Sequence, residues 1–423
     1  TLAGGKHTDF FIGETGLIEA AGEGLRAQYA GEADLIIDGS STIALPGLVN
    51  THTHAAMSLL RGYADDMILQ DWLSQKIWPL EAHLKPSDVY WGTKLSCLEM
   101  IRTGTVAFND MYFMMEEAAR AVDEVGIRAT LSYGFIDLFD AGKREAECKA
   151  TENLVRHIRS LNNPRITAAV GPHAIYTVSP DGLKWCAEFA AQEKIGIHVH
   201  LAETEKEVVD CLAQHGKRPA VHLDECGILT QRTVAAHCCW LDEAESTLLG
   251  KRGVSVSHNP SSNMKLATNR AMPYHWLSAA GANVCLGTDG CASNNNLDMF
   301  EETKTAALLQ KFFWNNPTQF PAHEALQVAT ANGSRALGLP TGALVAGAPA
   351  DIILVSTETA CNTPLHHATS NLVYSCSGSA VETTICNGRV LMLEREIPGE
   401  GAILAGAAEA AADLVKRASD APA

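Results

Sequence analysis

The stretch PGLVNTHTH at residues 46–54 is the part of the chain from which the fold is most readily inferred. An apolar run ends there in two histidines, His52 and His54, that are separated by one residue. Side chains two residues apart on a β-strand point to the same side, so both imidazoles can reach one metal ion. An ordinary pair of polar residues at a strand end is the alternative explanation.

Apolar runs of similar length recur along the chain, and each is followed by a polar loop and a longer helical pattern. The expected strands are Gly47–His54, Thr105–Asp110, Ile127–Phe135, Arg165–Gly171, Ile195–Leu201, Thr233–Cys238, Gly253–His258 and Ala282–Asp289. The expected helices between them include Ser87–Arg102, Met115–Val125, Lys143–Ser160 and Pro180–Lys194. Strands that alternate with helices form parallel sheets, and eight such units predict an α/β fold, a (β/α)₈ TIM barrel.

Both ends of the chain carry shorter strand-like pieces punctuated by glycine. They lie at Asp9–Ile12, Leu17–Ala20, Leu35–Asp38, Asp351–Val355, Val381–Cys386 and Arg389–Leu393. We therefore predict a small composite β-sandwich domain formed by both termini. It comprises residues 1–45 and residues 341–423, and the second part ends in a helix. The barrel occupies residues 46–340. A long loop at residues 55–86 would lie at the carboxyl ends of the strands, where barrel enzymes build their sites.

The composition of the 423 residues narrows the class of protein. Hydrophobic residues make up 46%, which excludes a disordered chain, and a formal charge of −17 disfavours binding to nucleic acid or to anionic membranes. No apolar run is long enough to span a bilayer, and twelve cysteines without a CxxC motif suit a reducing cytoplasm. The chain starts at Thr1 rather than Met, which leaves open whether preceding residues complete the first strand.

Four other expected strands also end in histidine or aspartate. These residues are His200, His237, His258 and Asp289. His198, two residues before His200, is expected to face the helices instead. Because parallel barrel strands end at one rim, the shared pattern predicts a catalytic Zn²⁺ or Fe²⁺ site with one position left for water. The strand at Arg165–Gly171 supplies no lysine that could bridge two ions, so one metal is expected.

Several longer motifs resemble the amidohydrolase superfamily in its mononuclear deaminase branch, and most closely its 5′-methylthioadenosine/S-adenosylhomocysteine deaminase family. The motifs are residues 46–54, HVHLAE at 198–203, SHNPSSNMKL at 257–266, GTDG at 287–290, WPLE at 78–81 and SNNNLDMF at 293–300. They extend across the whole expected barrel, and the flanking β-domain also matches the family. The resemblance therefore covers nearly the full chain.

The resemblance implies roles for the residues at the strand ends. The implied metal ligands are His52, His54, His200 and Asp289. Glu203 would protonate the ring nitrogen beside the attacked carbon, Asp289 would take the proton of the attacking water, and His237 would orient the resulting hydroxide. These roles agree with elementary chemistry, because displacing an aromatic amine requires a nucleophile at neutral pH together with an acid and a base.

The resemblance also implies three substrate contacts. Glu81 would bind the ribose, and a solvated loop charge is its alternative interpretation. His173 would reach the sugar, with a packing role as the alternative. Arg144 is the nearest match to the arginine with which family members bind a homocysteine carboxylate, although the loop around it departs from the family pattern.

We therefore expect a metal-dependent deaminase of S-adenosylhomocysteine, 5′-methylthioadenosine or adenosine, with ammonia and an inosine analogue as products. The alternatives are a deaminase of guanine, 8-oxoguanine, cytosine or a pterin, an s-triazine hydrolase, and a scaffold that has lost catalysis. The expected partner is the small nucleoside substrate. A homo-oligomer is compatible with this architecture, since barrels with an attached β-domain often pair.

Overall fold

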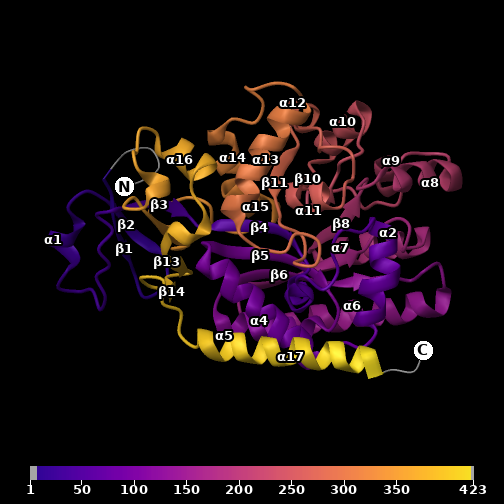
Figure 1. Cartoon of the computed structure of the whole chain (residues 1–423), viewed down its shortest axis with the longest axis horizontal. Helices are drawn as coiled ribbons and strands as arrows, with labels where there is room; N and C mark the ends of the chain where they lie inside the picture. Colours follow the sequence, from indigo (N-terminus) through magenta and orange to yellow (C-terminus); the bar gives the residue numbers. More distant parts are fainter. Residues whose placement is uncertain (1–6, 421–423) are drawn as a thin grey trace.

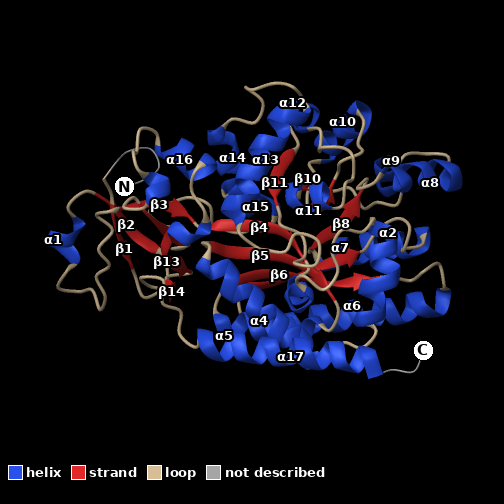
Figure 2. Ribbon diagram, in the orientation of Figure 1, coloured by secondary structure: helices blue, strands red, loops and turns tan. Residues whose placement is uncertain are grey.

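The centre of the protein is a ring of parallel strands, seen in the computed structural model, which describes residues 7–420 (Figures 1 and 2). The eight strands are β4 (Leu48–Thr53), β5 (Thr105–Tyr112), β6 (Arg128–Phe135), β7 (Ile166–Pro172), β8 (Gly196–Leu201), β9 (Thr233–His237), β10 (Ser255–His258) and β11 (Asn283–Leu286). They are hydrogen-bonded in sequence order from β4 to β11, which confirms the predicted barrel strands. Bonds between β4 and the end of β11 close the ring, since Thr51 Oγ1 donates to Leu286 O and Asp289 N donates to His52 O.

Helices cover the outside of the ring and confirm the alternating pattern. The main ones are α4 (Pro86–Arg102), α5 (Met115–Val125), α6 (Ala141–Ser160), α7 (Pro180–Glu193), α8 (Glu205–His215), α10 (Glu243–Arg252), α12 (Tyr274–Ala279) and α13 (Met299–Phe313). Local chemistry sets their ends. Asp242 and Glu245 form a capping box at the start of α10, and Gly253 ends the helix with a φ of 71°.

Two small antiparallel sheets from the chain termini pack together beside the barrel. One pairs β1 (Asp9–Ile12) with β2 (Ile18–Gly22); the other has the order β14 (Arg389–Met392), β13 (Val381–Cys386), β12 (Ile352–Ser356) and β3 (Thr42–Pro46). Ile18, Ile352 and Ile385 form their shared core. The sequence alone therefore identified the composite β-domain.

One expected strand of this domain is wrong. Leu35–Asp38 is irregular, and Leu35 and Ile36 are about half exposed, whereas Ile43 and Leu45 of β3 are buried. β3 pairs with β12 along its full length and leads through Gly47 into β4. Pairing with a strand three hundred residues away, which no local pattern reveals, determines which of the two apolar stretches becomes a strand.

The terminal helix α17 (Glu400–Asp420) lies along α4 of the barrel and not on the small sheets (Figure 1, yellow). Its Ala407, Ala410 and Leu414 are buried. The approach is close, because a Cβ on Gly406 would come within 2.6 Å of the Trp91 ring. Glycine at this position therefore allows the helix to pack tightly against the barrel.

The long connection after β4 folds into short helical turns. They are η1 (Ala55–Leu60), α2 (Leu69–Trp72), η2 (Leu73–Ile77) and α3 (Trp78–Glu81). We call residues 66–84 the cover segment, because several of its side chains line the cavity described below. Within residues 7–420, no helix is long and apolar enough to cross a membrane.

Candidate active site

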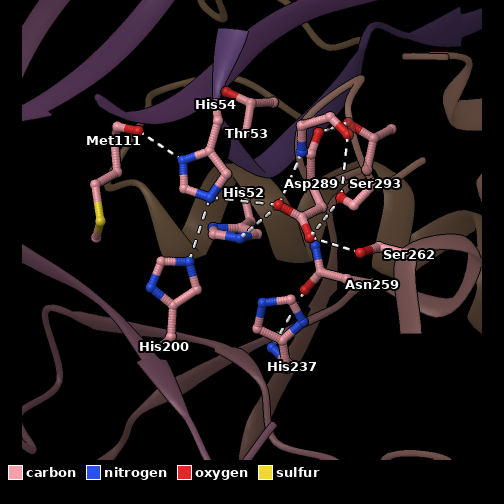
Figure 3. A network of polar contacts seen from close by, with 12 residues as sticks. His52, Thr53, His54, Met111, His200, His237, Asn259, Ser262, Asp289 and Ser293 are labelled. Atoms are coloured by element: carbon pink, nitrogen blue, oxygen red, sulfur yellow. Dashed lines mark hydrogen bonds and ion pairs between the residues drawn. The ribbon is translucent and has the colours of Figure 1, made fainter. Parts of the chain in front are cut away.

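Four side chains from three strand ends meet at the carboxyl end of the barrel (Figure 3). Asp289 Oδ1 lies 3.3 Å from His52 Nε2 and 3.3 Å from His54 Nε2. His200 Nε2 lies 3.3 Å from His54 Nε2. The structure thus brings together the four residues that the resemblance implied as metal ligands.

These separations fit a shared metal ion. Ligand atoms about 2.0–2.1 Å from a tetrahedral ion are about 3.3 Å from one another. His52 Nε2 is buried and has no hydrogen-bond partner in the described part of the chain, a costly arrangement unless the lone pair is used. Burial lowers the pKa of His52 to about 4, so its ring is neutral at pH 7, as a ligand must be. The donor set therefore suits a divalent metal ion.

The second nitrogen of each ligand histidine is held by a partner. His54 Nδ1 lies 2.6 Å from Met111 O, and His200 Nδ1 lies 2.7 Å from His173 O. A carbonyl only accepts, so both Nδ1 atoms donate and both Nε2 atoms keep a lone pair for the metal. The hydrogen bonds outside the quartet thus select the tautomer that binds metal.

His198 lies inside the barrel, and the expectation that it faces the helices is wrong. Its Nε2 is 2.7 Å from His52 Nδ1, beneath the proposed metal position. The physical reason is the two-residue period of a strand, which places His198 and His200 on the same side. His198 therefore completes the support of the third ligand histidine.

His258, which ends its strand at the same rim, lies apart from the quartet. Its Nε2 lies 3.3 Å from Gln310 Nε2 of α13, so the ring packs outward. The preceding residue, Ser257, faces the barrel interior and bonds to Thr51 Oγ1 at 2.7 Å. Because side chains alternate along β10, Ser257 points into the barrel and His258 points towards the surrounding helices.

Asp289 is fixed by hydroxyl groups on its other oxygen. Ser262 Oγ donates to Oδ2 at 2.6 Å and Ser293 Oγ at 3.1 Å. Its backbone is left-handed, with a φ of 66°, and His237 shares this conformation with a φ of 69°. Such positions are strained in residues other than glycine and concentrate at functional sites.

Glu203 and His237 lie beside the quartet. Burial, reinforced by the Asp289 charge, raises the pKa of Glu203 to about 8, so this side chain carries a proton at neutral pH. His237 Nδ1 lies 2.9 Å from Asn263 Nδ2 and 3.8 Å from Glu203 Oε1. Since Asn263 donates, His237 Nδ1 accepts, and its Nε2 carries the proton. An acid and a hydrogen-bond donor thus adjoin the proposed metal position.

A cavity opens above these groups and holds two of the three predicted substrate contacts. Glu81 and His173 both line it. Tyr112 donates to Glu81 Oε1 at 2.6 Å, and burial raises the pKa of Glu81 to about 7. His173 is buried, which lowers its pKa to about 3, so the ring is neutral.

The structure does not bring Arg144 to this cavity. It lies in the first turns of α6, where its Nη1 is 3.2 Å from Ser179 Oγ and its guanidinium faces Asp137 and Asp181. No arginine or lysine is among the described residues that line the cavity. The lining instead includes the apolar side chains Leu69, Trp72, Leu73 and Trp78 of the cover segment together with Leu266, which we call the apolar wall.

Comparisons with known proteins agree with this site. Residues 43–391 match the sequence pattern of the Amidohydrolase family. A 5′-deoxyadenosine deaminase of Methanoregula boonei is 73% identical over 97% of this chain and 93% of its own length. A 5-methylthioadenosine/S-adenosylhomocysteine deaminase of Archaeoglobus fulgidus is 51% identical over 85% of each chain.

A solved structure extends the comparison to three dimensions. An adenosine deaminase from Xanthomonas campestris with bound zinc superposes with a TM-score of 0.89, at 35% identity, over 97% of this chain and 94% of its own. Sequence pattern, close relatives and fold thus agree with one another. The chain belongs to the Amidohydrolase family.

Proposed function

We propose that this protein deaminates adenosine-type nucleosides that carry a small apolar 5′ group, with 5′-deoxyadenosine as the preferred substrate and 5′-methylthioadenosine as a second one. The observation that carries the proposal is one cavity lined by three members of the metal quartet (His54, His200 and Asp289), a protonated Glu203, the carboxyl group of Glu81 and an apolar wall without a described cation. The names of the relatives from Methanoregula boonei and Archaeoglobus fulgidus support the same substrate class.

His52, His54, His200 and Asp289 would hold the metal. When bound, a divalent ion supplies a water molecule whose pKa is lowered towards neutrality. We propose Zn²⁺, because three imidazoles and one carboxylate suit it and because the structure from Xanthomonas campestris contains zinc. Fe²⁺ accepts the same donors.

The remaining residues supply acid and base. Glu203 gives its proton to the ring nitrogen next to the carbon that bears the amino group, which makes that carbon electrophilic. Asp289 takes the proton of the attacking water, and His237 holds the oxygen with its Nε2–H. Asp289 passes its proton to the amino group, the carbon–nitrogen bond breaks and ammonia leaves. The remaining hydroxyl proton returns to Glu203, which gives the keto form of the inosine-type product.

Glu81 and His173 would bind the sugar. Glu81 Oε1 already accepts from Tyr112, which leaves Oε2 for the ribose hydroxyls. The Thr177 hydroxyl donates its one proton to Ala174 O, so it accepts from His173 Nδ1 at 2.8 Å. His173 Nε2 therefore keeps a lone pair and accepts a hydrogen bond from the nucleoside.

The apolar wall decides between 5′ substituents. A homocysteine chain would bring an amino group and a carboxylate against Trp72 and Trp78, with no described cation in the lining to pair with the carboxylate. An unpaired charge that loses part of its hydration against apolar side chains is disfavoured, whereas a methyl or methylthio group gains from the same contact. S-adenosylhomocysteine is therefore expected to be the poorer substrate.

The test is the ratio of kcat/KM values for 5′-deoxyadenosine and S-adenosylhomocysteine, measured by ammonia release from metal-replete enzyme. Partial desolvation of an unpaired carboxylate is unfavourable, so we expect a preference of about tenfold or more for 5′-deoxyadenosine. Equal values for the two nucleosides would refute the assignment of the apolar wall.

The ribose contact gives a pH-dependent prediction. Ionised Glu81 accepts from the ribose hydroxyls, and its ionised fraction grows as the pH rises through about 7. For 5′-deoxyadenosine, kcat/KM should therefore rise by up to roughly tenfold per pH unit below that pKa and then level off. Comparison with the 2′,3′-dideoxy analogue isolates this effect, because other titrating groups act on both substrates. Glu81→Gln should remove the difference between the two profiles; an unchanged difference would rule out Glu81 as the ribose ligand.

A further inference from the structure

The cover segment, residues 66–84, packs into the core through apolar side chains but receives few hydrogen bonds from side chains elsewhere in the protein. Among the described residues, only two side chains from outside the segment form hydrogen bonds with it: Tyr112, which bonds to Glu81, and Arg417, which bonds to His83 O. Its own side chains otherwise bond to backbone oxygens nearby in the chain: Trp72 Nε1 donates to Ala64 O, and Ser74 Oγ donates to Gln70 O. Buried Trp72, Ile77 and Leu80 anchor the segment in the core, while these two side chains fix the polar groups near Glu81.

Both attachments lie at the same end of the segment. Tyr112 extends from β5 and holds the carboxylate of Glu81 itself. Arg417, near the end of α17, donates from Nη2 to His83 O at 3.1 Å and from Nε at 3.3 Å. The turn between the two points is tight, since His83 N donates to Leu80 O and Leu84 N donates to Glu81 O. A shift of His83 is thus transmitted directly to Glu81.

The guanidinium of Arg417 also joins this turn to the start of α4. It pairs with the carboxylate of Asp88, which caps the helix by accepting from Lys85 N at 2.8 Å. Asp88 is almost completely buried, and Arg417 is 18% exposed. A largely desolvated guanidinium with several acceptors gives a rigid contact, unlike an exposed surface pair.

We propose that α17 is a positioning element of the active site and that Arg417 is its key residue, holding the α3–α4 turn so that Glu81 faces the ribose. This rests on the sugar-binding role proposed above for Glu81. Arg417 does not line the cavity, so it acts through His83 and Asp88 and touches no substrate. The C-terminal helix would thereby contribute to substrate recognition as well as to packing.

The chain offers a matched control at the other end of the same helix. Arg102, the last residue of α4, pairs with Glu400, the first residue of α17. This pair lies at the opposite end of both helices from Asp88 and Arg417. Arg417→Gln and Arg102→Gln each remove one ion pair between α17 and α4. A merely structural role for α17 predicts lower thermal stability in either variant, without a change in KM that depends on the ribose hydroxyls.

The test compares KM and kcat of both variants for 5′-deoxyadenosine and its 2′,3′-dideoxy analogue. We expect Arg417→Gln to raise KM for 5′-deoxyadenosine roughly tenfold, with little change in kcat and little effect on the dideoxy analogue. Arg102→Gln should leave both KM values unchanged, and Arg417→Lys should partly restore binding. Equal effects on the two nucleosides, or equal effects of the two variants, would overturn the proposal.

Two further measurements separate this proposal from the ribose assignment. The double variant Glu81→Gln/Arg417→Gln should be no worse than Glu81→Gln alone, because coupled residues are not additive. Hydrogen exchange of residues 78–85 should accelerate in Arg417→Gln but not in Arg102→Gln. Unchanged hydrogen exchange in Arg417→Gln would overturn the positioning role. If Glu81→Gln still preferred 5′-deoxyadenosine over the 2′,3′-dideoxy analogue to the same extent as the unmodified enzyme, the ribose assignment itself would have failed.

Discussion

Replacing Glu203 by glutamine should lower kcat for 5′-deoxyadenosine by about a thousandfold, within the range known for loss of a general acid. The buried carboxyl, whose pKa is raised to about 8, is the described group that is best placed to bring a proton to the ring. Glutamine keeps the size of the side chain but cannot transfer a proton to the ring nitrogen. Steady-state ammonia release measures the effect.

The control for this variant is Glu205→Gln. Glu205 is exposed in the first turn of α8, two residues further along the chain, and should be replaceable without loss. Metal content should stay the same in both variants, because neither residue belongs to the quartet. A Glu203→Gln enzyme with near-normal kcat would assign the acid to another group.

Removing the metal should lower activity by about a thousandfold or more, since a metal contributes several kcal/mol of transition-state stabilisation. His52 Nε2 is buried and has no hydrogen-bond partner among the described residues, so removal of the metal leaves this nitrogen unsatisfied. Re-addition of Zn²⁺ should restore turnover and also raise the midpoint of thermal unfolding, because the ion binds only the folded protein.

Dialysis against a chelator followed by titration with Zn²⁺ measures both effects together. Recovery should saturate at one ion per chain, as expected for a quartet without a bridging lysine. The His200→Ala variant should not bind Zn²⁺ tightly, and added Zn²⁺ should not restore its turnover. A chelated enzyme that keeps full activity would contradict the metal assignment.

The barrel could be predicted from sequence because it depends on local patterns, and the same patterns place histidine and aspartate at one rim. The choice of four metal ligands among these residues came from the family resemblance. Strand ends such as HTH at residues 52–54 combine a two-residue period with ligand-type side chains, and parallel strands place these ends at one rim. The expectation that His198 faces the helices was wrong. The strand period already required His198 to lie on the same side as His200.

The remaining features depend on contacts between residues far apart in the chain. Tyr112 meets Glu81 and Arg417 meets His83 across the fold, and neither pair has a sequence spacing that would indicate it. β3 pairs with β12, more than three hundred residues away, which is why Leu35–Asp38 was mistaken for the strand. Arg144 failed to reach the cavity because α6 begins at Ala141 and directs it towards Ser179.

The most direct test of the whole account is product analysis with 5′-deoxyadenosine and enzyme that holds one metal ion per chain. The account predicts one ammonia for each 5′-deoxyinosine formed, with the bond between base and sugar intact. Release of free adenine, or absence of ammonia from metal-replete enzyme, would contradict it.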